Sequence, residues 1–105
     1  MTSTNRKRLT PEIRIARMEE IFDKALDIMA RAMECPEEFL AFQGEIRKLD
    51  RYYTGSRWKK DFELDEQGKL PKDLKRGVLS EDGIYNLLER NKELLEEIEG
   101  ETADE

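Results

Sequence analysis

The feature that most constrains the fold is an apolar periodicity that returns along most of the chain. In three long stretches, residues 11–34, 36–54 and 80–99, apolar residues recur at alternating spacings of three and four. Such spacing places apolar side chains on one face of an α-helix. In the first stretch that face consists of Ile15, Met18, Phe22, Ala25, Met29 and Ala32. The sequence therefore predicts an all-α fold, in which three amphipathic helices bury these faces against one another.

The ends of the three helices carry recognisable signals. Thr10 is a typical N-cap, and Pro11 suits the first helical position because its missing N–H costs nothing there. Pro36 opens the second helix in the same way, and the short connection before it predicts that the first two helices are antiparallel. Ser80 is the predicted N-cap of the last helix, and Gly100 is its predicted end.

The segment between the second and last helices is predicted to form a short extra helix and an ordered loop. Gly55 is expected to be a left-handed C-cap, followed by a helix from 57 to about 64. On that helix Trp58 is expected to be largely buried and to anchor the segment. Residues 70–77 read as one tight helical turn, opened by proline and closed by glycine. The predicted architecture is an antiparallel three-helix bundle with these additions.

The chain of 105 residues has the length of a single domain. We predict a disordered basic N-terminus at 1–9, one helical bundle at 10–99 and a disordered acidic tail at 100–105. The formal net charge of −6 is concentrated near the C-terminus, because residues 93–105 contain seven acidic residues and no basic one. The net charge of the whole chain therefore says little about its partners.

Three features favour a cytoplasmic protein. The single cysteine, Cys35, has no second cysteine with which to form an internal disulfide. No apolar run approaches the length that spans a bilayer. The basic N-terminal residues are not followed by the apolar segment of a secretory signal.

No catalytic site is visible in the sequence. The chain has no histidine, which removes the commonest general base and the commonest metal ligand. The only thiol, at Cys35, is surrounded by Glu34, Glu37 and Glu38, which oppose a thiolate. Neither a P-loop nor a dinucleotide-binding glycine pattern occurs. We therefore expect no enzymatic activity, no catalytic residue and no cofactor.

A cluster of carboxylates near residue 61 suggests a metal site but does not complete one. Asp61, Glu63 and Asp65 have the spacing of the first three ligands of an EF-hand loop. That loop needs glycine where this chain has Glu66, and glutamate where it has Lys72. The sequence therefore predicts no bound metal, and residues 61–66 are expected to form a solvated helix end.

The strongest candidate for a binding surface is basic and aromatic. Residues 47–60 contain six basic residues against one acidic residue, with two tyrosines and a tryptophan among them. Arginine, tyrosine and tryptophan are enriched at protein interfaces, which favours a protein partner. The predicted contact residues are Arg57, Lys60, Lys75 and Arg76. The alternative is an accessory nucleic-acid-binding protein using segment 47–76, whose rings could stack on bases. The low isoelectric point, about 4.9, disfavours that alternative.

Residues 52–82 contain a dense motif. It includes Tyr52-Tyr53, Trp58, Asp61-Phe62-Glu63, Gly68-Lys69-Leu70-Pro71 and the run from Asp73 to Asp82. The motif resembles that of the family called domain of unknown function 4298, closely over 52–91 and more loosely over 12–51. The resemblance implies a small bacterial helical protein, and it brings no activity and no catalytic residue. The motif could form a binding surface or only a demanding turn.

Overall fold

The computed structural model describes residues 10–103, and all regular secondary structure in this range is helical. The elements are α1 (Pro11–Ala30), α2 (Pro36–Ala41), α3 (Gln43–Thr54), α4 (Ser56–Glu66), the 3₁₀ helix η2 (Gly77–Leu79) and α5 (Gly83–Ala103). The all-α prediction is confirmed. The predicted disordered N-terminus, 1–9, lies outside the described residues, as do residues 104–105.

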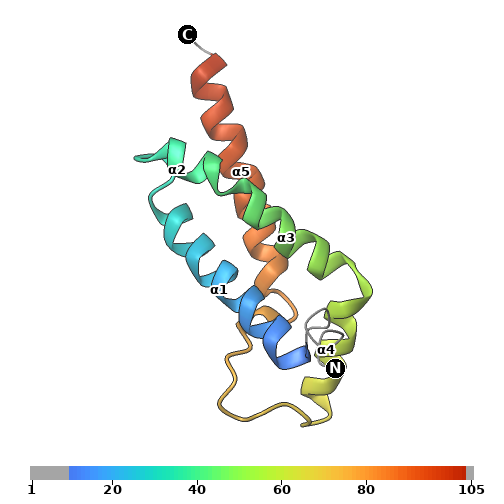
Figure 1. Ribbon diagram of the computed structural model, residues 1–105. Coiled ribbons are helices and arrows are strands. Elements are labelled where there is room, and N and C mark those ends of the chain that lie inside the picture. Colours follow the sequence, from blue (N-terminus) through green and yellow to red (C-terminus); the bar gives the residue numbers. More distant parts are fainter. Residues whose placement is uncertain (1–9, 104–105) are drawn as a thin grey trace, which may run out of the picture.

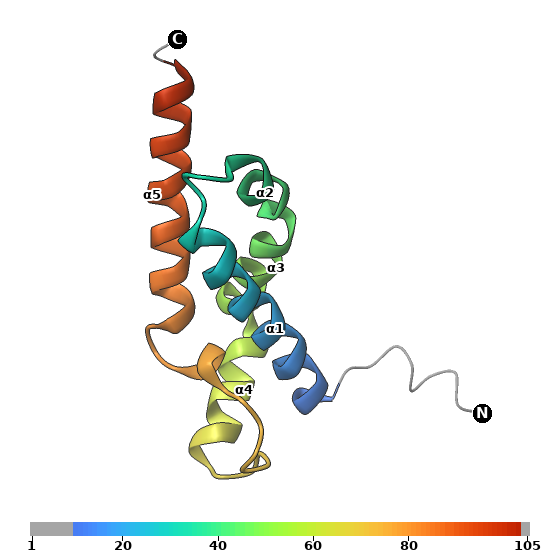
Figure 2. The same cartoon turned by 90° about the vertical axis from the view of Figure 1, so that its left-hand side faces the viewer.

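The three longest helices pack against one another, with α4 and η2 at one end of the molecule and α2 at the other. α1, α3 and α5 are in pairwise contact, and the C-terminal part of α5 extends past α2 (Figures 1 and 2). α4 turns away from the end of α3 and lies near the start of α1. η2 contacts α1, α4 and α5, so it lies where these helices meet. None of the helices within 10–103 is both long and apolar enough to cross a membrane.

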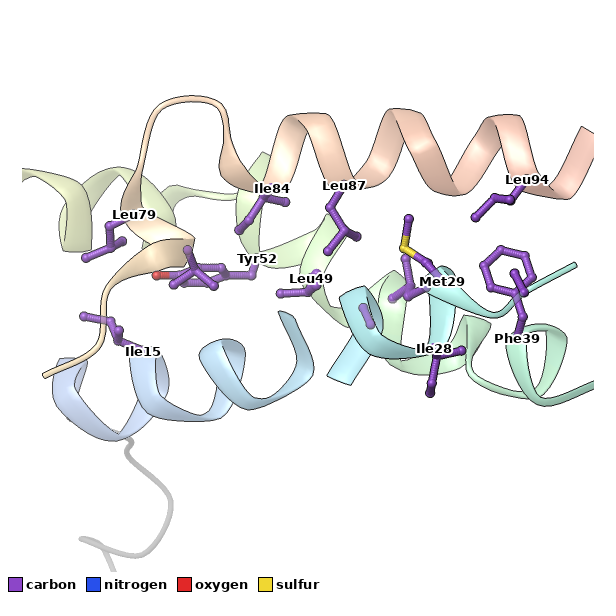
Figure 3. Close-up of a cluster of buried hydrophobic side chains, with 14 of the residues drawn as sticks. Ile15, Ile28, Met29, Phe39, Leu49, Tyr52, Leu79, Ile84, Leu87 and Leu94 are labelled. Carbon is purple, nitrogen blue, oxygen red and sulfur yellow. The ribbon is translucent and has the colours of Figure 1, made fainter. Parts of the chain in front are cut away.

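The core runs lengthwise between α1, α3 and α5. At one end it contains Ile15 and Leu79, and at the other it contains Phe39 and Leu94, with Leu49 between them (Figure 3). Each of these side chains is at most 2% exposed. The apolar faces predicted from the three-four spacing are therefore the faces that are buried.

The predicted N-cap of α1 is confirmed, but the helix is shorter than expected. The Thr10 hydroxyl accepts a hydrogen bond from the Ile13 N–H at 3.2 Å. The helix ends at Ala30 rather than near residue 34, and turns lead from there to Pro36. A salt bridge of 2.8 Å joins Arg31 in this turn to Glu38 on α2.

The predicted second helix is divided into two. Phe42, with φ −85° and ψ −3°, separates α2 from α3. Gly55 is extended, with φ −96° and ψ −178°, so the predicted left-handed C-cap is wrong. It is instead the N-cap position of α4, which extends to Glu66 rather than to about residue 64. The left-handed residue is Gly68, with φ 71°, which follows the end of α4.

Two predictions near the C-terminal half are also wrong. Residues 70–77 contain one hydrogen-bonded turn that Pro71 opens, but Gly77 does not close it and instead begins the 3₁₀ helix. α5 continues through Gly100 to Ala103, so the predicted disordered tail is helical over 100–103. A glycine in right-handed conformation weakens a helix without ending it, and α5 is long enough to tolerate that cost. The Ser80 hydroxyl accepts from the Gly83 N–H at 3.0 Å, as predicted for a cap, but α5 itself begins at Gly83 rather than at residue 80.

Candidate functional site

A buried ion pair joins the start of α1 to the middle of α4. Asp61 is fully buried, and the Arg14 guanidinium donates to both of its carboxylate oxygens, at 2.9 Å from Nε and 2.5 Å from Nη2. The Tyr52 hydroxyl on α3 donates to the same carboxylate at 2.8 Å. The prediction of a solvated helix end is therefore wrong for Asp61, which connects three helices.

This network changes the acidity of its two donors. Burial, and then the hydrogen bond to Asp61, raise the pKa of Tyr52. The hydrogen bond to Asp61 raises the pKa of Arg14, so the guanidinium stays charged. A buried charge that loses its partner is strongly unfavourable, so each member of the network depends on the others.

The backbone of Val78 is held from two sides. The Glu19 carboxylate on α1 accepts from the Val78 N–H at 3.1 Å, and the Trp58 indole N–H on α4 donates to the Val78 carbonyl at 2.8 Å. We call these three residues the clip. The Val78 side chain is fully buried, and Glu19 is only 7% exposed. The clip therefore fixes η2 between α1 and α4.

Two glycines next to the clip are closely packed, Gly83 more tightly than Gly77. A Cβ atom on Gly83 would lie 2.5 Å from the Ser80 hydroxyl oxygen and 2.8 Å from the Gly77 carbonyl oxygen. A Cβ atom on Gly77 would lie 3.0 Å from a carboxylate oxygen of Glu19. Close packing thus accounts for Gly77, which belongs to the motif, and for Gly83, which follows it, without a ligand.

Residues 67–76, which we call the strap, connect α4 to η2. Arg76 donates to Asp65 at 2.5 Å and to the carbonyl oxygens of Pro71 and Leu74 at 2.7 and 3.2 Å. Lys75 forms a salt bridge of 3.1 Å with Asp23 on α1. Two of the four predicted contact residues, Lys75 and Arg76, are therefore engaged within the protein.

The other two predicted contact residues belong to a larger exposed group. Arg57 and Lys60 are exposed on α4, and neither forms an ion pair with a described residue. The same holds for three further cations of the basic segment on α3 and α4. We call the group the cationic surface, and its members are Arg47, Arg51, Arg57, Lys59 and Lys60. α3 and α4 pack on each other, so the group spans two adjoining helices.

The aromatic residues of the same segment pack on one another. Trp58 stacks on Phe62, with ring centroids 5.0 Å apart, and meets Tyr53 edge to face at 5.1 Å. All three side chains are half-buried, so the prediction that Trp58 is largely buried overstated its burial. Its anchoring role holds, because the indole N–H belongs to the clip.

Two of the carboxylates that suggested a calcium loop form salt bridges within the protein. Asp61 pairs with Arg14, and Asp65 pairs with Arg76. Within residues 10–103, no group of three or more histidine, cysteine, aspartate or glutamate side chains is placed to hold a metal ion.

Sequence reasoning missed the contributions of α1 to this region. Glu19 lies four residues after Ile15 and three before Phe22, so helical spacing already places it on the apolar face. A buried carboxylate needs a hydrogen-bond partner, so the position of Glu19 on this face was the signal that α1 binds a polar group of another element. Asn91 interrupts the seam of α5 in the same way, and it exchanges two hydrogen bonds with Gln43, at 3.0 and 2.9 Å.

Comparison with known families gives one match. Residues 15–99 match the model of the family described as Domain of unknown function (DUF4298). The matched stretch contains the clip, the strap and the cationic surface. No curated protein and no solved structure matches the chain.

Proposed function

The chain belongs to the DUF4298 family, and we propose that it is a non-catalytic protein-interaction module. Its contact surface in this proposal is the cationic surface on α3 and α4. The observation that carries the proposal is that these exposed cations form no ion pair with any described residue. In this role α1, α3 and α5 are the antiparallel three-helix frame, and the protein works in the bacterial cytoplasm.

The expected partner is a protein with an acidic segment. Opposite charge steers encounter and fixes register at interfaces, and cations free of intramolecular partners are available for it. Arg47 and Arg51 are one helical turn apart on α3, and Arg57 and Lys60 are three residues apart on α4. An acidic helix or extended segment could therefore contact a row of cations on each helix.

The second candidate is the accessory nucleic-acid binder. The same cations support it, because basic grooves hold phosphates. The aromatic residues support it less, since non-specific binding of single strands depends on exposed ring faces. Trp58 already contacts Phe62 and Tyr53 and donates its N–H to Val78.

The proposal can be tested with two polyanions as probes. Labelled poly-L-glutamate and single-stranded oligo(dT) would be titrated with wild type and with Arg57→Ala/Lys60→Ala in low salt. The matched control is Lys72→Ala/Lys92→Ala, which removes the same charge from exposed positions outside the cationic surface. We expect poly-L-glutamate to bind wild type and the control, and to bind the Arg57→Ala/Lys60→Ala variant at least about threefold more weakly.

Two results would overturn this proposal. If both double variants bind poly-L-glutamate equally well, the contact surface lies elsewhere. If oligo(dT) binds and poly-L-glutamate does not, the nucleic-acid function takes the place of the protein-interaction function. Circular dichroism of each variant checks that the helices are intact.

A further inference from the structure

The second part of the strap, residues 70–76, has few backbone hydrogen bonds, whereas the N–H groups of Gln67, Gly68 and Lys69 still donate to carbonyl groups of α4. Within residues 70–76, the Leu74 N–H donates to the Pro71 carbonyl at 3.2 Å, and no other backbone N–H of these residues donates to a backbone carbonyl of a described residue. The residues that follow have more backbone hydrogen bonds. The Leu79 N–H donates to the Arg76 carbonyl, and the Ser80 N–H donates to the Gly77 carbonyl. The clip binds both backbone groups of Val78. Segments with few backbone hydrogen bonds open locally at low free-energy cost.

The side-chain interactions that attach the strap to the rest of the protein are also more exposed than those of the clip. Leu70 is buried, but Leu74 is only half-buried. The side chains of the Lys75–Asp23 salt bridge are 75% and 48% exposed. Exposed ion pairs of this kind contribute little to stability. The Arg76–Asp65 pair is better covered, at 33% and 24%, and it is therefore the principal charged attachment.

The path of the strap allows it to move without the rest of the fold. It passes around the end of the molecule beyond α1 and α4, away from the core between α1, α3 and α5 (Figures 1 and 2). Gly68, with φ 71°, lies near one end, and Gly77 lies at the other. Gly68 follows the end of α4 and Gly77 begins η2, so the segment between them belongs to neither helix.

We propose that the strap is a latch, which opens between Gly68 and Gly77 while the clip stays closed. Opening releases Lys75 and Arg76 from their carboxylate partners and adds both cations to the cationic surface. Arg76 is two residues from Val78, whose carbonyl is bonded to the Trp58 indole. At most about 7 Å of chain therefore separates Arg76 from the point at which the clip holds η2 on α4, and Arg57 of the cationic surface precedes Trp58 on that helix. Opening of the latch would thereby regulate partner binding. That regulation rests on the proposed function, whereas the opening of the strap does not.

Thiol labelling tests whether the strap opens by itself. In a Cys35→Ser background, Leu70→Cys places a buried thiol in the strap itself, and Leu79→Cys places one beside the clip. We expect the thiol at position 70 to react at least about tenfold faster than the one at 79. Equal rates with equal dependence on urea would show that the strap opens only when the whole protein unfolds. Limited trypsin digestion of wild type, with first cleavage expected after Lys72 or Lys75, gives the same answer without substitution.

A matched pair of variants tests the regulation. Asp65→Asn removes the partner of Arg76, and Glu66→Gln removes the same charge from an exposed neighbour. Relative to Glu66→Gln, we expect Asp65→Asn to speed labelling at position 70 and to tighten poly-L-glutamate binding about two- to fivefold. Faster labelling with unchanged binding would overturn the regulation and keep the latch. If wild type binds no poly-L-glutamate, the proposed function fails, and labelling still decides the latch.

Discussion

The Asp61 carboxylate receives three hydrogen bonds inside the protein, two from Arg14 and one from Tyr52. A buried ion pair often adds little net stability, because the two charges lose their hydration. Removing one partner is nevertheless costly, by about 3–5 kcal/mol. We therefore interpret the network as a device that specifies where α4 lies against α1 and α3.

The stability that the protonated Tyr52 hydroxyl contributes should be lost in alkaline solution. Burial raises the pKa of Tyr52 in the folded state, so the folded protein keeps the phenol proton where the unfolded chain, with an ordinary pKa of about 10, loses it. This contribution to stability is complete below about pH 10 and is lost as the pH rises further. In Tyr52→Phe it is absent at every pH.

The measurement is urea unfolding of wild type and Tyr52→Phe at a series of pH values. We expect a constant difference in the free energy of unfolding below about pH 9, and a decrease of up to ~1.4 kcal/mol per pH unit above about pH 10. A difference that stays constant up to about pH 11 would show that the hydroxyl is not buried against Asp61.

At the level of elements, the features that could be predicted from the sequence are those that neighbouring residues determine, such as capping hydrogen bonds. The capping bond from Thr10 and the hydrogen bond from Gly83 to Ser80 are both present. The strap and η2 were mispredicted because their conformation depends on distant partners. Glu19 bonds to Val78 across 59 positions of sequence, and no local propensity registers such a contact.

Two glycines of α5 should respond in opposite ways to alanine. Inside a helix, Gly→Ala usually stabilises by roughly 0.5–1 kcal/mol, and we expect this at Gly100, where a Cβ atom meets nothing within 4 Å. At Gly83 the same change forces a Cβ atom against Ser80 and the Gly77 carbonyl. We expect Gly83→Ala to destabilise by about 1–3 kcal/mol. Thermal or urea unfolding of both variants measures this, and stabilisation by both would contradict the close approach.

At the scale of the whole molecule, most of the dense motif serves the junction of α1, α4 and η2. Trp58, Asp61, Gly77 and Ser80 have structural partners there. The basic segment was recognised from composition, but composition does not say which cations are engaged. Arg57 and Lys60 are exposed, whereas Lys75 and Arg76 bind carboxylates on other elements. That distinction required the tertiary structure.

The most direct test of the cationic surface is an NMR titration of isotope-labelled wild-type protein with poly-L-glutamate in low salt. Each backbone amide reports separately, so the measurement locates the contact without any substitution. We expect shift changes concentrated in residues 47–60, and little change over 83–100, where acidic side chains repel the probe. Shift changes centred on α5, or an absence of changes at saturating probe, would contradict the proposed contact surface.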